Sequence, residues 1–490
     1  MTLKVTLKDT SGRPFELSNA AAVFGLGLLL VGAALLSFTD SRLDSATADE
    51  PVHVVDGIVQ ARSGTWNAGA QHPPLVRELY GAAAIAGGAA EPPRIVLRDY
   101  VRSTRAYLFA PRAGKPVDEP LLCARAVAIG FFLALLLAGF AAAGGGSSGF
   151  FAAALLAGQT ALFPHGHLAG TDVPVTFFMT AALVFLAEEI ARPRGMTALA
   201  LVVALAAALA TKGSAAILLA FVPLAFLVAA WRAEGRRRRY LAVEGFLAPL
   251  LAVVLLSLLL RLWVAGDPPG MLEFFCRLYG LSPADQARLL ALDRIDHPLA
   301  RYAFVLVFHL RESQAGLASY FLGEVSSRPS PLYHLVAIAV KSPVVWLAAG
   351  AAGTLLSVRK GASSRARLLY GFAVFYLIAS LPGSRIGVRH MFPLVAAVSA
   401  GAAILLAPLL SRHGRALFAA ALLIALSPLA FSRRLGGNGL LGAVFAKPPL
   451  ADSNLDWGQD LLRLRRLLGE RRIPASDVAV AYFGGDVPAA

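Results

Sequence analysis

The feature that most constrains this chain is a series of long apolar runs. Runs of about 17–23 residues, such as 19–38 and 241–263, contain few charged side chains, and a helix of that length crosses the roughly 30 Å hydrocarbon core of a bilayer. Of the 490 residues, 57% are hydrophobic and only 15% are charged, whereas soluble domains are about 25% charged. The sequence therefore predicts an all-α polytopic membrane protein.

The apolar runs predict about eleven transmembrane helices, each with ends uncertain by a few residues. The expected spans are residues 19–38, 121–143, 148–164, 173–190, 196–211, 214–231, 241–263, 338–357, 368–382, 391–409 and 416–431.

The Lys and Arg residues of the short loops predict the orientation of these spans, because cytoplasmic loops are enriched in both. With the N-terminus in the cytoplasm, the inner short loops carry thirteen Lys and Arg residues and the outer ones carry three. An odd number of spans then places the C-terminus on the outer side. The same loops account for the net charge of +15. A basic chain often indicates nucleic-acid binding, but no basic soluble segment interleaved with aromatics is present, so we expect a lipid bilayer and no nucleic acid as partner.

The chain divides into a membrane domain over residues 1–431 and a polar C-terminal segment over residues 432–490. Within the membrane domain, residues 39–120 and 265–337 form two long outer segments. In the C-terminal segment, an amphipathic helix is expected from Leu461 to Leu468, followed by a strand-like run at 478–483. We expect this segment to be small, and either complete or cut short.

The first outer segment begins with two adjacent carboxylates, Asp49 and Glu50, followed by Pro51 and His53. Proline suits the first turn of a helix, so these carboxylates lie near a helix start at the membrane surface. They are placed to accept a proton or to hold a metal, or else they are an ordinary helix cap. Further along, His72-Pro73-Pro74 precedes an amphipathic segment, 75–90, which is expected in the membrane interface.

Further polar motifs occupy the other outer loops. His165, His167 and Asp172 lie within eight residues, which permits a zinc site, although the spacing matches no standard ligand pattern. Asp172 alternatively caps the following span, with Pro174 in its first turn.

Several cations also lie in outer loops or at the ends of spans, where charge is costly and usually functional. Arginine binds phosphate through its bidentate fork, and each cation alone is equally explained as a side chain that extends to the interface. The residues concerned are Lys212, Lys341, Arg385, Arg389 and the neighbouring His390.

Carboxylates and cations therefore share one membrane face. A carboxylate suits deprotonation of a hydroxyl acceptor, and the cations suit a phosphate. A lipid-linked sugar donor uses both groups, although this assignment is not unique.

Seven segments in one order resemble a known family, the bacterial phospholipid carrier-dependent glycosyltransferases. This family is grouped with the protein O-mannosyltransferases and the aminoarabinose (lipid A) transferases in the GT-C class. The resemblance extends from about residue 19 to residue 470. The segments are Asp49-Glu50-Pro51, His72-Pro73-Pro74-Leu75, Thr171-Asp172-Val173-Pro174, Thr211-Lys212-Gly213, Lys341-Ser342-Pro343, Arg385-Ile386-Gly387-Val388-Arg389-His390 and Ser453-Asn454-Leu455-Asp456-Trp457-Gly458-Gln459-Asp460.

The resemblance implies a GT-C fold with amphipathic helices in the first outer loop, located in the bacterial inner membrane. It also implies a periplasmic active site that transfers a monosaccharide, of hexosyl, mannosyl or aminoarabinosyl type, from a polyprenyl-phosphate donor. In the family the acidic residue of the first outer loop is catalytic. By resemblance Asp49 is the general base, with Glu50 beside it, and transfer inverts the anomeric centre.

The resemblance also implies a binding site for the donor phosphate. The candidates, in falling order, are Arg385, Arg389, Lys341 and Lys212, because cations stabilise the charge on the leaving phosphate. Four other site candidates are His53, His72, Asp172 and His390. A divalent metal near Asp49 is left open, and the sequence requires none.

The acceptor is left open between a protein Ser or Thr hydroxyl and a glycolipid of the lipid A type. A different class, a transporter or flippase for a lipid-linked sugar, would place charges midway through its spans and repeat one half of the chain in the other. Here the charges lie mainly at one face, which favours the enzyme.

Overall fold

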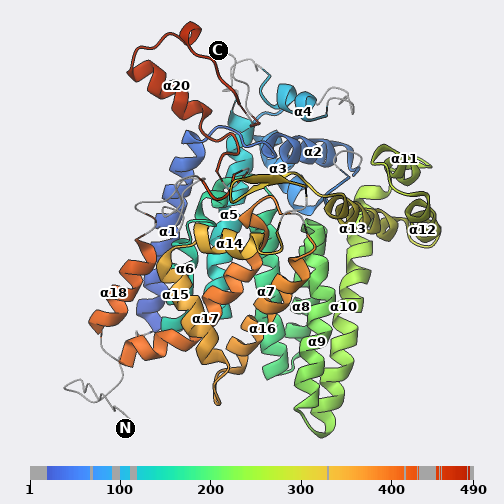
Figure 1. The fold of residues 1–490 in the computed structure, drawn as a ribbon. Coiled ribbons are helices and arrows are strands. Elements are labelled where there is room, and N and C mark those ends of the chain that lie inside the picture. Colours follow the sequence, from blue (N-terminus) through green and yellow to red (C-terminus); the bar gives the residue numbers. More distant parts are fainter. Residues whose placement is uncertain are drawn as a thin grey trace.

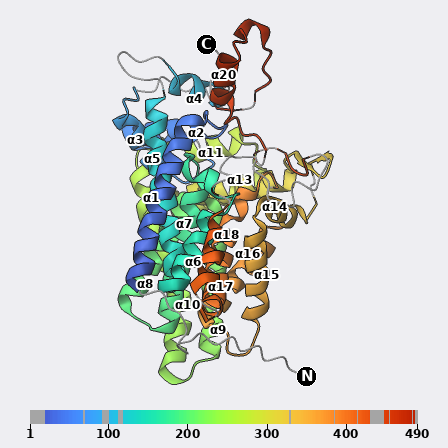
Figure 2. The same ribbon diagram turned by 90° about the vertical axis from the view of Figure 1, so that its left-hand side faces the viewer.

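The computed structural model is a bundle of roughly parallel helices with a cap of shorter, tilted elements at one end (Figures 1 and 2). It describes residues 19–66, 70–90, 100–110, 118–327, 330–383, 385–412, 415–427, 429, 448–451, 453, 455–482 and 484–485. Residues 432–447 of the C-terminal segment, among others, lie outside the described residues.

Six segments of the described chain are helical, long and apolar enough to cross a membrane. They are α1 (Asn19–Leu43), α5 (Glu119–Ala142), α7 (Asp172–Ala191), η3 (Gly213–Ile217) with α9 (Leu218–Trp231), α10 (Gly235–Val264), and η4 (Val388–Met391) with α17 (Phe392–Arg412). Shorter helices complete the bundle: α6 (Gly146–Ala157), α8 (Gly195–Thr211), α15 (Val344–Ser357), α16 (Ser364–Ser380) and α18 (Arg415–Leu426). One large apolar core runs through the bundle.

The predicted all-α polytopic fold is confirmed, since each expected span overlaps a helix of this bundle. The number of eleven crossings stays a prediction. One expected span, 338–357, is interrupted, because α14 (Tyr333–Lys341) ends before Pro343 and α15 begins after it. Ser342 is extended (φ −92°, ψ 145°), as the residue before a proline tends to be.

The cap contains the outer segments of the chain. Its elements are α2 (Glu50–Ser63), α3 (Leu75–Ala86), α4 (Tyr100–Leu108), η2 (Phe163–His167), α11 (Met271–Leu278), α12 (Pro283–Asp293), α13 (His297–Ala315), β1 (Ser319–Phe321), β2 (Glu324–Ser326), α14, α20 (Leu461–Glu470) and η7 (Ala475–Asp477).

The helices α2 and α3 form the tightest pair in the cap. A Cβ on Gly57 would lie 1.8 Å from the carbonyl oxygen of Arg77, and a Cβ on Gly81 would lie 1.9 Å from the carbonyl carbon of Gly57. Only glycine permits this backbone contact. The amphipathic helix expected from residue 75 is thereby confirmed as α3, and its contact with α2 fixes the helix that begins just after Asp49.

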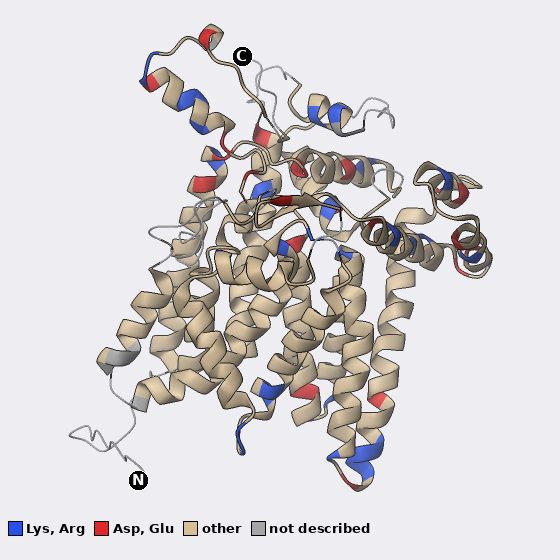
Figure 3. Cartoon of the chain, in the orientation of Figure 1, with Lys and Arg blue, Asp and Glu red and all other residues tan. Residues whose placement is uncertain are grey.

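Charged residues gather at both ends of the molecule and are sparse along the bundle (Figure 3). At the end opposite the cap, a group of arginines covers the start of α10 (Figure 3). The start of α1 lies at that end as well, and α20 lies at the capped end (Figure 1). This arrangement agrees with the expected orientation, which stays a prediction.

The C-terminal segment lies against the cap. The amphipathic helix expected from Leu461 is confirmed as α20. The strand-like run at 478–483 forms no strand over its described residues, 478–482. Instead, the Tyr482 hydroxyl donates a hydrogen bond to the carbonyl oxygen of Gly458 (2.9 Å).

Candidate active site

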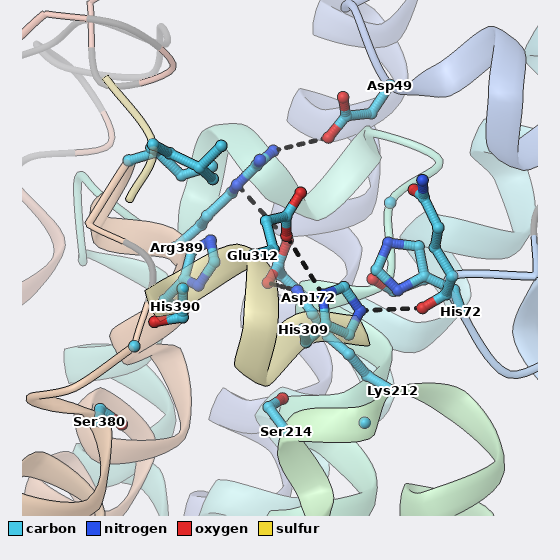
Figure 4. A pocket seen from close by; sticks show the side chains of 18 of the residues that line it. Asp49, His72, Asp172, Lys212, Ser214, His309, Glu312, Ser380, Arg389 and His390 are labelled. Carbon is cyan, nitrogen blue, oxygen red and sulfur yellow. Dashed lines mark hydrogen bonds and ion pairs between the residues drawn. The ribbon is translucent and has the colours of Figure 1, made fainter. Parts of the chain in front are cut away.

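A cavity of about 630 Å³ lies where the cap meets the bundle. Its lining side chains come from the start of α2, the loop before α3, the starts of α7 and η3, helix α13, the segment around η4, and the C-terminal segment. Figure 4 shows several of them directed into the same space. Residues far apart in the sequence therefore meet around one cavity.

Asp49 occupies the N-cap position of α2 and lines this cavity. Its side chain makes no capping hydrogen bond, so the simple helix-cap explanation is not realised. One carboxylate oxygen lies 3.1 Å from Nη1 of Arg389, and 43% of the side chain remains exposed. Arg389 thus holds one oxygen of this carboxylate, and the rest of the group remains open to the cavity.

A second carboxylate, Asp172, lies in the first turn of α7. Its Oδ1 accepts a hydrogen bond from Nζ of Lys212 (2.6 Å), and its Oδ2 lies 3.9 Å from Nε of Arg389. The four charges therefore form a row, Asp49–Arg389–Asp172–Lys212, in which acids and cations alternate (Figure 4).

Lys212 and Arg389 reach the cavity because each lies at a break between two helices. Lys212 is extended (φ −154°, ψ 138°) between α8 and η3, and Arg389 lies in the short η4, just before α17. A continuous helix would bury these side chains in the bundle or direct them to lipid. The break lets each cation reach a cavity carboxylate.

Arg389 is held between the two aspartates and an aromatic ring. Its guanidinium carbon lies 4.0 Å from the ring centroid of Trp457, and only 10% of its side chain is exposed. Its buried Nε has no hydrogen-bond partner among the described residues. This nitrogen faces the Asp172 carboxylate from 3.9 Å, so the guanidinium is directed at both aspartates.

Three histidines line the wall of the cavity beside the charged row. The ring centroids of His53 and His72 are 5.4 Å apart, and those of His72 and His309 are 5.2 Å apart. Burial lowers the pKa of His53 to about 4, with nearby Asp49 opposing the shift and Arg77 adding to it. The pKa of His72 is likewise well below its usual value, mainly because of burial. Both rings are therefore neutral near pH 7 and offer uncharged hydrogen-bonding groups.

His309 was not predicted from the sequence. It lies on α13, donates from Nε2 to the carbonyl oxygen of Gln71 (2.9 Å), and places Nδ1 3.4 Å from a carboxylate oxygen of Glu312. Glu312 also lines the cavity.

Glu50 is not brought into the cavity. Its carboxylate is 1% exposed and accepts five hydrogen bonds, two from Arg125, two from Thr47 and one from the Ala169 amide. Burial alone would raise the pKa of Glu50, but the charge and hydrogen bonds of Arg125 hold it below its usual value. These contacts close Glu50 off from the cavity, and the expected role beside Asp49 stays a prediction that they do not support.

Seven of the ten predicted site residues line the cavity: Asp49, His53, His72, Asp172, Lys212, Arg389 and His390. Besides Glu50, two predicted cations lie elsewhere. Lys341 is buried where α14 ends, and Arg385 donates to the carbonyl oxygen of Leu381. Of the four candidate phosphate-binding cations, Arg389 and Lys212 therefore line the cavity, and their role stays a prediction.

Two further cavity residues, Asp56 and Trp457, are not among those predicted from the sequence. Asp56 forms a buried ion pair with Arg77 (2.6 Å) at the cavity wall. Asp56 lies seven residues after Asp49, which places both on one face of α2, and that spacing was the available signal. Trp457 belongs to a noted motif from which no chemistry was deduced.

The zinc site considered for the outer loop is not formed. His167 Nε2 lies 2.8 Å from a carboxylate oxygen of Asp44, and His165 Nδ1 bonds to the carbonyl oxygen of Ala161 (3.1 Å). Within the part of the chain that the structure describes, no three His, Cys, Asp or Glu side chains are grouped to hold a metal.

Comparisons with known proteins agree with this architecture. Residues 67–265 match the family described as dolichyl-phosphate-mannose-protein mannosyltransferase. The structure is similar to that of ArnT from Cupriavidus metallidurans bound to undecaprenyl phosphate, with a TM-score of 0.53 and 15% sequence identity over 77% of this chain and 59% of that chain. It is also similar to the Archaeoglobus fulgidus oligosaccharyltransferase in the apo form, with a TM-score of 0.48 and 18% identity over 84% of this chain and 56% of that chain. No curated protein sequence matches the chain.

These findings confirm the resemblance predicted from the sequence. Residues 67–265 match a segment of the protein mannosyltransferase family, and the fold is similar to the GT-C fold of ArnT. The chain spans less than two thirds of the length of the two solved structures. The matched family segment contains His72, Asp172 and Lys212, while Asp49 and Arg389 lie on either side of it.

Proposed function

We propose that this protein is a membrane glycosyltransferase that transfers a monosaccharide from a polyprenyl-phosphate donor to a hydroxyl acceptor. The observation that carries the proposal is the alternating row Asp49–Arg389–Asp172–Lys212 inside one cavity. The row supplies a carboxylate for an acceptor hydroxyl and two cations for a phosphate. The undecaprenyl phosphate bound by ArnT, whose fold is similar, supports a donor of this class.

Arg389 and Lys212 form the phosphate end of the site. Asp172 holds both cations at one place, so little reorganisation is needed when a phosphate arrives. As the sugar departs, negative charge grows on the leaving polyprenyl phosphate, and cations already in position stabilise that charge.

Asp49 acts as the general base. It takes the proton of the acceptor hydroxyl as the oxygen attacks the anomeric carbon of the donor sugar. The bond from that carbon to the phosphate oxygen breaks, and both of its electrons leave with the polyprenyl phosphate. Attack opposite the leaving group inverts the anomeric centre. We assign no step to a metal and none to Glu50.

The neutral rings of His53 and His72 contribute to the sugar subsite. Uncharged imidazoles bind hydroxyl groups without drawing the phosphate away from Arg389 and Lys212. His390 and His309 line the same cavity and complete its polar wall.

The enzyme would act on the periplasmic side of a bacterial inner membrane. This placement rests on the thirteen Lys and Arg residues of the inner short loops and on the cavity's position under the opposite, capped end. The charged row lies at the ends of spans rather than midway along them, which favours a transferase over a transporter or flippase.

The test uses the purified protein in proteoliposomes with a defined donor, such as undecaprenyl-phosphate mannose or undecaprenyl-phosphate aminoarabinose. Release of undecaprenyl phosphate that requires an acceptor supports the proposal. Movement of the intact donor across the membrane without cleavage would overturn it in favour of a flippase. Mass spectrometry of envelope proteins and lipids, with and without the gene product, then identifies the sugar and distinguishes a protein acceptor from a glycolipid.

A further inference from the structure

The C-terminal segment runs across the cap and joins both sides of the cavity. The Ser453 hydroxyl donates to the carbonyl oxygen of Ile386 (2.9 Å), within the loop that leads to Arg389. Just upstream, the carbonyl oxygen of Pro449 accepts a hydrogen bond from the amide of Leu322 (2.9 Å), beside the β1–β2 hairpin. The segment is thus anchored on the phosphate side of the site.

The same segment is also bonded to the chain that leads to Asp49. The Ala48 amide donates to the carbonyl oxygen of Trp457 (3.0 Å), and the Ser45 amide donates to that of Gln459 (2.8 Å). The Gln459 side chain, which is buried, accepts from the Trp457 amide (2.8 Å). These bonds fix the backbone of Trp457 within a few residues of the proposed base.

Between these anchors the indole of Trp457 lies against the guanidinium of Arg389, 4.0 Å from ring centroid to guanidinium carbon. The indole is itself buried and packs on Leu168. A guanidinium stacked on an aromatic face keeps its edge free for hydrogen bonds in the ring plane. Here Nη1 contacts Asp49 at 3.1 Å, and Nε faces Asp172 at 3.9 Å.

We infer that Trp457 is a positioning residue that orients the Arg389 guanidinium toward the donor phosphate, so that the C-terminal segment completes the active site. The inference rests on the proposed role of Arg389 as a phosphate ligand. It gives a purpose to the Ser453–Asp460 motif, which is otherwise unexplained.

A different role for Trp457 makes a different prediction. Its ring also lines the cavity, so a direct contact with the sugar or lipid would make its contribution independent of Arg389. A positioning role requires instead that Trp457 contribute little once Arg389 is gone. A double-mutant cycle separates the two roles.

The experiment measures binding of undecaprenyl phosphate to the purified full-length protein, which requires no chemistry. We expect Trp457→Ala to weaken binding roughly 3- to 30-fold, the range of a desolvated cation–π contact. Trp457→Phe should recover most of the loss, and Trp457→Leu, which fills space without an aromatic face, should not. In an Arg389→Ala background, Trp457→Ala should change binding less than about twofold.

The control is Trp231→Ala, which removes an exposed tryptophan at the far end of the bundle and should leave binding unchanged. The inference would be overturned if Trp457→Ala weakened binding as much in the Arg389→Ala background as it does in the wild type. Normal binding by both Trp457→Leu and Trp457→Ala would also overturn it. If Arg389→Ala alone binds normally, the phosphate assignment under the proposed function fails instead. Thermal unfolding of each variant identifies any that is misfolded. If Trp457→Ala is misfolded, the comparison of Trp457→Phe with Trp457→Leu takes its place.

Discussion

Asp49 and Glu50 are neighbours in the chain, yet they belong to two different regions of the molecule. Asp49 opens into the cavity with 43% of its side chain exposed. Glu50 is 1% exposed and lies in the seam between the cap and the bundle. Successive residues of a helix point about 100° apart, so the start of α2 directs one carboxylate into the cavity and the next into the protein interior.

The two carboxylates also have different kinds of cationic partner. Arg389 contacts Asp49 through a single nitrogen. Arg125 binds both oxygens of Glu50 and also donates to the carbonyl oxygens of Ser41, Asp44 and Ser45. A loosely held carboxylate exchanges protons and partners, whereas a saturated one joins α1, α2 and α5. Substitutions on the two sides should therefore affect different measurements.

The largest effect is expected for Asp49→Asn. An amide cannot take the acceptor proton, so kcat should fall by about 10²- to 10⁴-fold, the contribution of a general base. Thermal unfolding should stay close to that of the wild type, because the side chain is half exposed. The measurement is release of undecaprenyl phosphate from a purified donor. Asp49→Glu is the matched control and should retain part of the activity, while near-normal turnover by Asp49→Asn would remove the base assignment.

The next effect is expected for Glu50→Gln, on stability rather than chemistry. Removing one partner of a buried ion pair leaves Arg125 uncompensated, at a cost of about 3–5 kcal/mol. The unfolding temperature in detergent should fall markedly. The protein that remains folded should turn over at a rate close to the wild type. A fully stable but inactive Glu50→Gln variant would place Glu50 in the chemistry after all.

A smaller effect is expected for Arg389→Ala, at the other end of the row. Loss of charge-assisted hydrogen bonds costs about 1.5–3 kcal/mol, which should raise the donor KM roughly 10- to 150-fold. The acceptor KM should change little. Arg385→Ala is the matched control, since Arg385 does not line the cavity as described, and it should change the donor KM less than Arg389→Ala does. Equal effects from both arginines would return Arg385 to the phosphate site.

The smallest effect is a pH dependence of stability from Glu50. Its pKa in the folded protein is held below the usual value by Arg125. The ion pair therefore stabilises the fold above the unfolded-state pKa of about 4.3 and loses that contribution as the pH falls further. Wild type should lose unfolding temperature below about pH 4 more steeply than Glu50→Gln. Parallel curves for the two proteins would contradict this.

The sequence predicted the fold class and much of the cavity for physical reasons. Apolar runs long enough to cross a bilayer have few alternatives to a transmembrane helix, so the bundle followed directly. Polar residues at membrane depth are costly, so Lys212 and Arg389 stood out against their surroundings. Asp49 and Asp172 were found at helix starts for a similar reason.

The remaining assignments depended on long-range partners that a single sequence does not show. Glu50 looked equivalent to Asp49 until the fold brought Arg125 onto it. Arg385 and Arg389 share one loop, and only the backbone conformation around η4 decides which of them enters the cavity. Trp457 and His309 reach the site through the C-terminal segment and the second outer segment, whose positions depend on packing against the cap.

The most direct test of the central claim is an experimental structure of the full-length protein with undecaprenyl phosphate bound. The proposed function predicts the phosphate inside the cavity, within hydrogen-bonding distance of both Arg389 and Lys212 and on the same side as Asp49. A phosphate bound outside this cavity, or held by Arg385 or Lys341 without Arg389, would contradict it.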